Sequence, residues 1–95
     1  MLYMHVYYTA KDGDDLMNFL HEAEEAGIVS KTRKEKGCLQ YEYFISAEND
    51  REMLLLEKWE SAEDQKVHGT QDHFVMLGEI KKKYGLETRI EKIEQ

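Results

Sequence analysis

Four consecutive apolar residues, Met53-Leu54-Leu55-Leu56, lie inside a short run that is typical of a β-strand. Successive side chains of a strand point to opposite faces of the sheet, so an unbroken apolar run predicts a strand that is buried on both faces. A chain of 95 residues has few elements with which to cover two faces, and a domain of this size buries only about 60–65% of its unfolded surface. The sequence therefore favours a sheet that shares its core with another subunit.

The remaining patterns predict an alternation of strands and helices in the order βαββαβ. Runs rich in Tyr, Val and Leu predict strands, and apolar residues at helical spacing predict helices. The expected strands are residues 2–9, 38–46, 52–60 and 86–93. The expected helical regions are residues 15–34, weakened near Gly27, and a second region from Ser61 to about Tyr84, interrupted at 69–72, where Thr70 or Asp72 is expected to cap the resumed helix.

This order is typical of the ferredoxin-like fold, an α+β architecture in which a four-stranded antiparallel sheet carries two helices on one face. No proline, Ser/Gly-rich linker or low-complexity tract marks a boundary, so residues 1–95 are expected to form a single domain. Two helices cover only one face of the sheet. The sheet of a second copy is the simplest cover for the other face, so a homodimer is expected.

Composition and charge exclude several classes of partner. The formal net charge of −7 argues against nucleic-acid binding, which requires a basic surface. No segment approaches the roughly 20 apolar residues of a membrane span, and the first residues lack the basic and small-residue pattern of a secretory signal. Cys38 is the only cysteine, which favours a reduced compartment. We expect a cytoplasmic protein that binds neither nucleic acid nor membrane.

Three segments resemble the antibiotic biosynthesis monooxygenase (ABM) domain family, and they occur in the family's order at compatible spacing. The family pattern is roughly E-x-G-C-x-x-Y-E, then E-x-W, then H-x-x-[ST]-x-H-[FY]. The matching segments are Glu35–Tyr43, Leu56–Ser61 and His68–Phe74, and the resemblance extends from Leu2 to Ile93. It implies a dimeric α+β barrel with a pocket in each subunit. Family members include quinol monooxygenases, anthrone oxygenases, haem-degrading enzymes and an isomerase of a phosphorylated quorum-signal sugar.

Departures from the family pattern narrow these options. Gly78 stands where haem-degrading members carry a haem-ligating histidine, which argues against haem breakdown. Leu55 stands where anthrone oxygenases carry an asparagine, which argues against the polyketide reaction. The chain also has no G-x-G-x-x-G or P-loop fingerprint for a dinucleotide or nucleotide. We therefore expect a reaction that needs no cofactor.

Three residues in the matching segments are candidates for acid–base chemistry: His68, His73 and Glu57. An imidazole exchanges protons near neutral pH, so either histidine can serve as a general acid or base. Alternatively, His73 packs against a neighbouring helix, in line with Leu77. Glu57 lies on the doubly apolar strand and must pair or shift its pKa, as a catalytic acid or as a structural partner. No H-E-x-x-H spacing is present, so no metal site is predicted.

Five further residues are candidates for binding a substrate. Trp59 can form an aromatic wall against a flat ring, or it can be a core or interface residue. Tyr41 lies on one face of the second strand, while His5 and Tyr7 share a face of the first strand. Either Tyr41 or the pair His5 and Tyr7 can line a pocket. Alternatively, the tyrosines can pack at a dimer interface. Phe74 closes the third matching segment.

The resemblance and the candidate residues together predict a cofactor-independent monooxygenase acting on a small quinol or enolisable aromatic substrate. In this hypothesis His68 is the base, Trp59 is the stacking wall, and Tyr41 or Tyr7 polarises the substrate. One alternative is a keto–enol isomerase of a small, phosphorylated hydroxyketone, which requires the same deprotonation without oxygen. A second alternative is a dimer that binds a small molecule without turnover.

Overall fold

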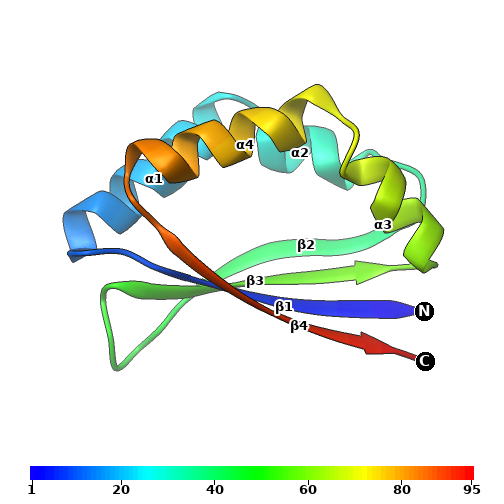
Figure 1. Cartoon of the computed structure of the whole chain (residues 1–95), viewed down its shortest axis with the longest axis horizontal. Helices are drawn as coiled ribbons and strands as arrows, with labels where there is room; N and C mark the ends of the chain where they lie inside the picture. Colours follow the sequence, from blue (N-terminus) through cyan, green and yellow to red (C-terminus); the bar gives the residue numbers. More distant parts are fainter.

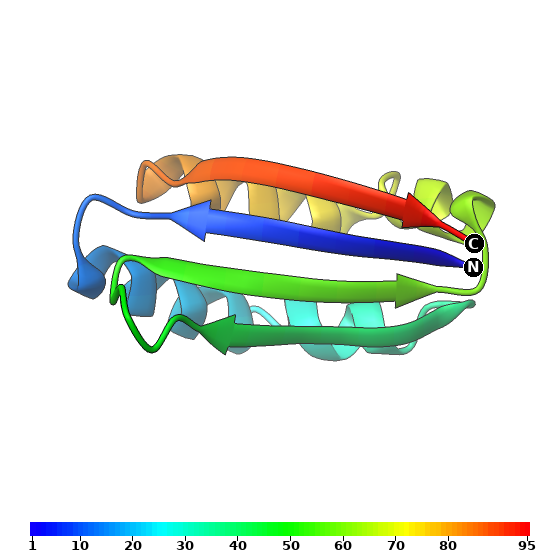
Figure 2. The ribbon, with the colours of Figure 1, turned by 90° about the horizontal axis from the view of Figure 1, so that it is seen from below.

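A four-stranded antiparallel sheet carries all of the helices on one of its faces (Figure 1). The computed structural model describes residues 1–95. The strand order is β2-β3-β1-β4, with the two termini side by side at one end of the sheet (Figure 2). The elements are β1 (Leu2–Thr9), α1 (Gly13–Glu25), α2 (Ile28–Arg33), β2 (Cys38–Ile45), β3 (Glu52–Trp59), α3 (Ala62–His68), α4 (Asp72–Lys83) and β4 (Glu87–Glu94). The ferredoxin-like α+β fold expected from the sequence is confirmed.

Both helical regions are broken where the sequence placed the breaks. Gly27 has a φ of 74°, a left-handed conformation that favours glycine, and this residue separates α1 from α2. Ser61 caps α3 by accepting a hydrogen bond from the backbone of Asp64. The cap expected for the resumed helix is wrong, because Gln71 is the N-cap of α4. The Thr70 hydroxyl instead donates to the Val67 carbonyl at the end of α3.

The core lies between the inner face of the sheet and the helices. Its members are apolar side chains that alternate along β1 and β3 and recur at helical spacing on α1 and α4. Leu16 and Phe19 of α1 are completely buried, and the Phe19 ring packs edge-to-face on Tyr8 of β1 with ring centroids 5.4 Å apart. This packing holds the helices over β1 and β3 and leaves β4 at the edge of the sheet.

The outer face of the sheet has no helix over it (Figure 2). Met53 and Leu55 of β3 are fully buried beneath the helices, but Leu54 and Leu56 point to the outer face and are only half-buried. Within one chain the predicted two-sided burial of β3 is therefore incomplete. No helix of the chain combines the length and the apolar character needed to span a bilayer.

Candidate functional site

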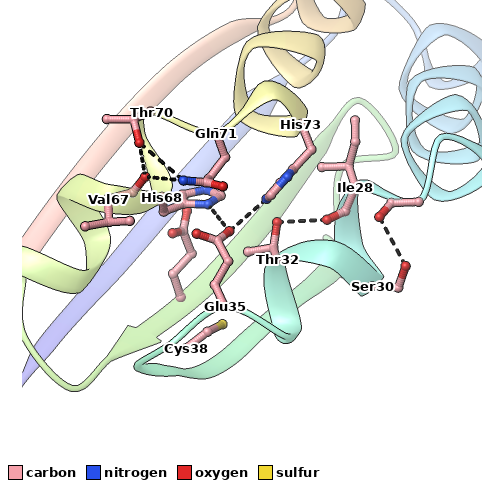
Figure 3. A network of polar contacts seen from close by, with 12 residues as sticks. Ile28, Ser30, Thr32, Glu35, Cys38, Val67, His68, Thr70, Gln71 and His73 are labelled. Atoms are coloured by element: carbon pink, nitrogen blue, oxygen red, sulfur yellow. Dashed lines mark hydrogen bonds and ion pairs between the residues drawn. The ribbon is translucent and has the colours of Figure 1, made fainter.

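A carboxylate between two imidazoles marks the end of the sheet where α2, α3 and α4 meet (Figure 3). Glu35 follows α2, His68 ends α3 and His73 lies in the first turn of α4. Oε2 of Glu35 lies 2.6 Å from Nδ1 of His68 and 2.8 Å from Nε2 of His73. All three side chains are at most 12% exposed. The break between α3 and α4 thus brings both histidines to one oxygen, although they lie too far apart to share a helical face.

The hydrogen bonds to Glu35 define the tautomer of each histidine. A carboxylate oxygen only accepts, so the two ring nitrogens that face it carry the protons. In the neutral imidazole of His68 the lone pair then lies on Nε2, which makes no hydrogen bond within the chain. The His68 ring is also held by tilted packing on Trp59, with centroids 5.1 Å apart. His68 is therefore a fixed imidazole with one nitrogen available as a base.

A cavity of about 290 Å³ opens between the inner face of the sheet and helices α3 and α4, and His68 is part of its wall. Seven of the 14 lining residues are hydrophobic when the rings of Tyr8 and Tyr41 are counted, which is typical of a pocket for a small organic ligand. The polar and charged residues of the wall are Tyr8, Tyr41, Glu57, Gln65, His68, Lys81, Thr88 and Lys92. Phe74 also lines the cavity and packs edge-to-face on His68, with ring centroids 5.2 Å apart.

Tyr41 is a buried residue in the wall of this cavity. Its side chain is 1% exposed, and its hydroxyl has no hydrogen-bond partner, as is also true of the adjacent Tyr43. Buried hydroxyls are normally paired, and the neighbouring Tyr43, whose ring centroid lies 6.2 Å from that of Tyr41, is the nearest such group on the same strand. Burial raises the pKa of Tyr41 well above its usual value, with a further rise from Tyr43. The hydroxyl therefore stays protonated and can donate.

Glu57 and Trp59 form a hydrogen-bonded pair at the base of the site. The Trp59 indole Nε1 donates to Oε1 of Glu57 over 3.0 Å, and Trp59 is completely buried. Burial raises the pKa of the Glu57 carboxyl, while the Trp59 hydrogen bond and the nearby His68 oppose that rise. Glu57 thus has a structural donor partner and also lies on the cavity wall.

The raised pKa of Glu57 makes folding stability depend on pH. The folded state holds the Glu57 proton more tightly than the unfolded state, where the pKa is about 4.3, so stability falls as pH rises from there through the folded pKa. Each unit of raised pKa costs about 1.4 kcal/mol above that range. We expect Glu57→Gln to be more stable than the parent at neutral pH, with the gain absent near pH 4. Urea unfolding at both pH values measures this gain, with Glu60→Gln on the exposed surface as the control for charge. A gain that is equal at both pH values would contradict the prediction.

Two lysines give the cavity a positive rim in an otherwise acidic chain. Lys81 of α4 and Lys92 of β4 line the cavity, where the only carboxylate is Glu57. The Lys81 ammonium lies 4.9 Å from the centroid of the Tyr8 ring, and burial lowers the pKa of this lysine. The rim therefore favours a ligand that carries or develops negative charge.

Cys38 lies near the site but is poorly suited to nucleophilic chemistry. Burial raises the pKa of its thiol to about 11, and the negative charges of Glu35 and Glu57 add to the rise. Cys38 instead packs against the hydrophobic core as a small, half-buried apolar residue.

Residues 1–76 match the family model described as antibiotic biosynthesis monooxygenase. The chain belongs to the antibiotic biosynthesis monooxygenase (ABM) family. Within this match lie Glu35, both histidines of the site and Glu57, whereas Lys81 and Lys92 lie beyond it.

Individual proteins are also similar to this chain in sequence or in fold. The uncharacterized protein YjcS of Bacillus subtilis (strain 168) is 31% identical over 65 residues, which are 68% of this chain and 57% of YjcS. The chain thus matches less than two thirds of that relative's length. A Bacteroides thetaiotaomicron structure of unknown function, with an oxidoreductase role suggested for it, has a TM-score of 0.87 at 23% identity and covers 99% of this chain and 96% of its own. A Deinococcus radiodurans structure named for the ABM family has a TM-score of 0.83 at 20% identity, over 100% and 92% of the two chains.

Four of the candidate residues meet at the cavity of this ABM domain: His68, Glu57, Tyr41 and Phe74. The others lie elsewhere. His73 contacts Glu35 and is not part of the cavity wall. Trp59 lies beneath His68 with no exposed surface, so it supports the imidazole and does not form the expected wall against a substrate.

The expectation that His5 and Tyr7 line the cavity is corrected by the direction of their side chains. Alternation along β1 places Met4, Val6 and Tyr8 on the inner face, so His5 and Tyr7 point to the outer face. There His5 lies 3.6 Å from Glu91, and Tyr7 packs under the Arg89 guanidinium of β4. Neither residue reaches the cavity of its own chain.

Four residues that the site uses were not among the candidates: Glu35, Tyr8, Lys81 and Lys92. Glu35 begins the first matching segment, so its place in the pattern was the available signal. Tyr8 lies next to Tyr7 in the sequence, but strand alternation places it on the opposite, inner face of β1. Lys81 follows Leu77 at helical spacing, but only the packing of α4 over the sheet shows that it lines the cavity.

Proposed function

We propose that this ABM domain is a monooxygenase that uses no cofactor and acts on a small quinol or enolisable aromatic compound. The observation that carries the proposal is His68, which is held by Glu35 through Nδ1, has no hydrogen-bond partner for Nε2 within the chain and lines the cavity. A histidine with one nitrogen bound to a carboxylate and the other facing a substrate is the usual arrangement of a general base.

The proposed reaction begins with proton removal by Nε2 of His68. The resulting enolate or phenolate is stabilised by the Tyr41 hydroxyl and by the positive charge of Lys81, both on the cavity wall. The electron-rich carbon then reduces dioxygen directly. One oxygen atom enters the substrate and the other leaves as water, and all four electrons come from the substrate. A hydroquinone thus becomes a hydroxyquinone without an external reductant.

An isomerase is the second candidate, and the two lysines favour it. The same base can move a proton between the carbons of a hydroxyketone, and Lys81 with Lys92 can bind an attached phosphate. The reactions differ in oxygen consumption. Binding without turnover is the remaining alternative and predicts ligand-dependent quenching of the single tryptophan, Trp59, with no product.

Oxygen uptake by the metal-stripped protein, measured over a panel of hydroquinones and enolisable aromatics, tests the proposal. We expect uptake of one dioxygen for each product that gains an oxygen atom. Turnover of phosphorylated hydroxyketones without oxygen uptake would replace the monooxygenase by the isomerase. Quenching of Trp59 by the panel with neither reaction would leave a binding protein.

Gly78 allows a test of whether ligands occupy this cavity. An alanine methyl group has open space there, so Gly78→Ala should retain binding and activity while gaining up to about 1 kcal/mol of helix stability. Gly78→Phe places a ring in the cavity and should abolish quenching of Trp59 by ligand. Retained quenching in the Phe variant, with its thermal unfolding intact, would place the ligand elsewhere.

The outer face of the sheet supports self-association as part of this proposal. Leu54, Leu56, Tyr3 and Tyr7 form a half-buried layer there that no helix covers. Sedimentation at micromolar concentration should give a dimer. Leu56→Lys should give a monomer, while Val75→Lys on the exposed side of α4 should leave the dimer intact. A monomeric parent, or a Leu56→Lys variant that stays dimeric, would contradict this assignment of the interface.

A further inference from the structure

Glu35, His68 and His73 have the composition of a transition-metal site. Their donor atoms, one carboxylate oxygen and two imidazole nitrogens, all lie within 4.8 Å of one another. Nitrogen and carboxylate ligands suit zinc and neighbouring divalent first-row metals, which bind them at about 2.0–2.2 Å. Three protein ligands leave a further coordination position open. The sequence contains no H-E-x-x-H spacing, so only the fold assembles this set.

The backbone around the three donors holds them in place. The Glu35 amide donates to the Thr32 carbonyl over 3.0 Å, and the Glu35 carbonyl accepts from the Cys38 amide over 3.2 Å, so Glu35 sits in a closed turn. His68 is packed between Trp59 and Phe74. A metal ion would replace the two protons that the imidazoles now direct at Glu35, and its insertion would lengthen the 2.6 Å and 2.8 Å contacts between Oε2 and the two nitrogens.

An acidic depression gives a cation access to Glu35 from solvent. The depression has a volume of about 430 Å³ and shares no lining residue with the substrate cavity. It is lined by Glu35, Lys36, Glu63, Asp64, Val67 and Gln71, three carboxylates against one lysine. This balance of charge attracts cations.

We propose that Glu35, His68 and His73 bind one divalent ion of the zinc class per chain, and that binding reverses the tautomer of His68. A metal on Nδ1 of a neutral imidazole leaves the ring proton on Nε2. Nε2 of His68, which has no hydrogen-bond partner within the chain, then changes from an acceptor into a donor. Metal binding does not depend on the proposed function. Inhibition of the reaction by the bound metal does, because it rests on the proposed role of His68 as the base.

Titration of the chelator-stripped protein with Co²⁺, followed by visible absorption, and with Zn²⁺, followed by calorimetry, tests the binding. We expect one ion per chain. Glu35→Gln and His73→Ala should each weaken the affinity by more than about 10-fold, while His21→Ala, on the exposed side of α1, should not. Absence of binding, or affinity that is equal in all four proteins, would overturn the site. His73→Ala keeps the test decisive if Glu35→Gln does not fold.

Long-range ¹H–¹⁵N spectra of the imidazoles test the tautomer without any substrate. We expect the His68 proton on Nδ1 in the stripped protein and on Nε2 in the zinc-loaded protein. A zinc-loaded protein that keeps the Nδ1 proton would overturn the tautomer reversal. Oxygen uptake adds a separate readout: zinc that binds and reverses the tautomer without inhibiting an active protein would count against His68 as the base and not against the metal site.

Discussion

Replacement of His68 by asparagine is expected to lower turnover of an accepted substrate by a factor of about 10²–10⁴, the usual contribution of a general base. Asparagine can still donate a hydrogen bond to Glu35 and is close in size, so the cavity and the fold should be kept. Oxygen uptake under saturating substrate measures the loss in kcat. His21→Asn, at an exposed position of α1, is the matched control and should retain the parental rate.

Ligand binding separates a lost base from a lost cavity. Quenching of Trp59 by substrate should persist in His68→Asn, because Tyr41, Glu57 and Lys81 still form the cavity wall. A variant that binds substrate and turns it over at the parental rate would remove His68 from the chemistry.

Glu35→Gln should also lower kcat, since an amide no longer specifies the Nδ1 proton of His68. Glu35 is thus a positioning residue for His68.

Gly37→Ala is expected to destabilise the fold by about 2–5 kcal/mol, from the left-handed backbone and overpacking together. Gly37 has a φ of +80°, and an added Cβ would lie 2.2 Å from Oδ2 and 2.7 Å from Cβ of Asp64. The clash reaches the Cβ of the neighbour, so rotation of the Asp64 carboxylate cannot relieve it. Because Gly37 lies two residues after Glu35, the displacement should also disturb the Glu35–histidine contacts.

Gly85→Ala is the matched control for the cost of a left-handed backbone conformation. Gly85 has a φ of +63° and no neighbour within 4 Å of an added Cβ, so only the cost of the left-handed conformation remains, about 1–2 kcal/mol. Urea unfolding of both variants measures the difference. Equal losses in the two variants would show that close approach to Asp64 is unimportant.

Most of the fold could be predicted from local sequence patterns. The turn and helix signals of α1 to α4, the alternation along β1 and the apolar run of β3 act over a few residues, so periodicity and capping predict them. The cap of α4 was misplaced, because the Thr70 hydroxyl is taken up by the preceding turn at Val67. Capping depends on which of several nearby backbone groups a side chain meets, and sequence alone does not rank them.

The candidate site was also predicted only in part from the sequence. By itself the sequence determined the family pattern, the histidine pair and the strand faces that hold Tyr41 and Glu57. Only the tertiary structure decided that His5 and Tyr7 face away from the cavity and that Trp59 lies beneath His68. It also brought Glu35 to both histidines across 33 and 38 positions of the chain. Contacts at such separations depend on how whole elements pack, because no local propensity links residues that meet only after the helices dock on the sheet.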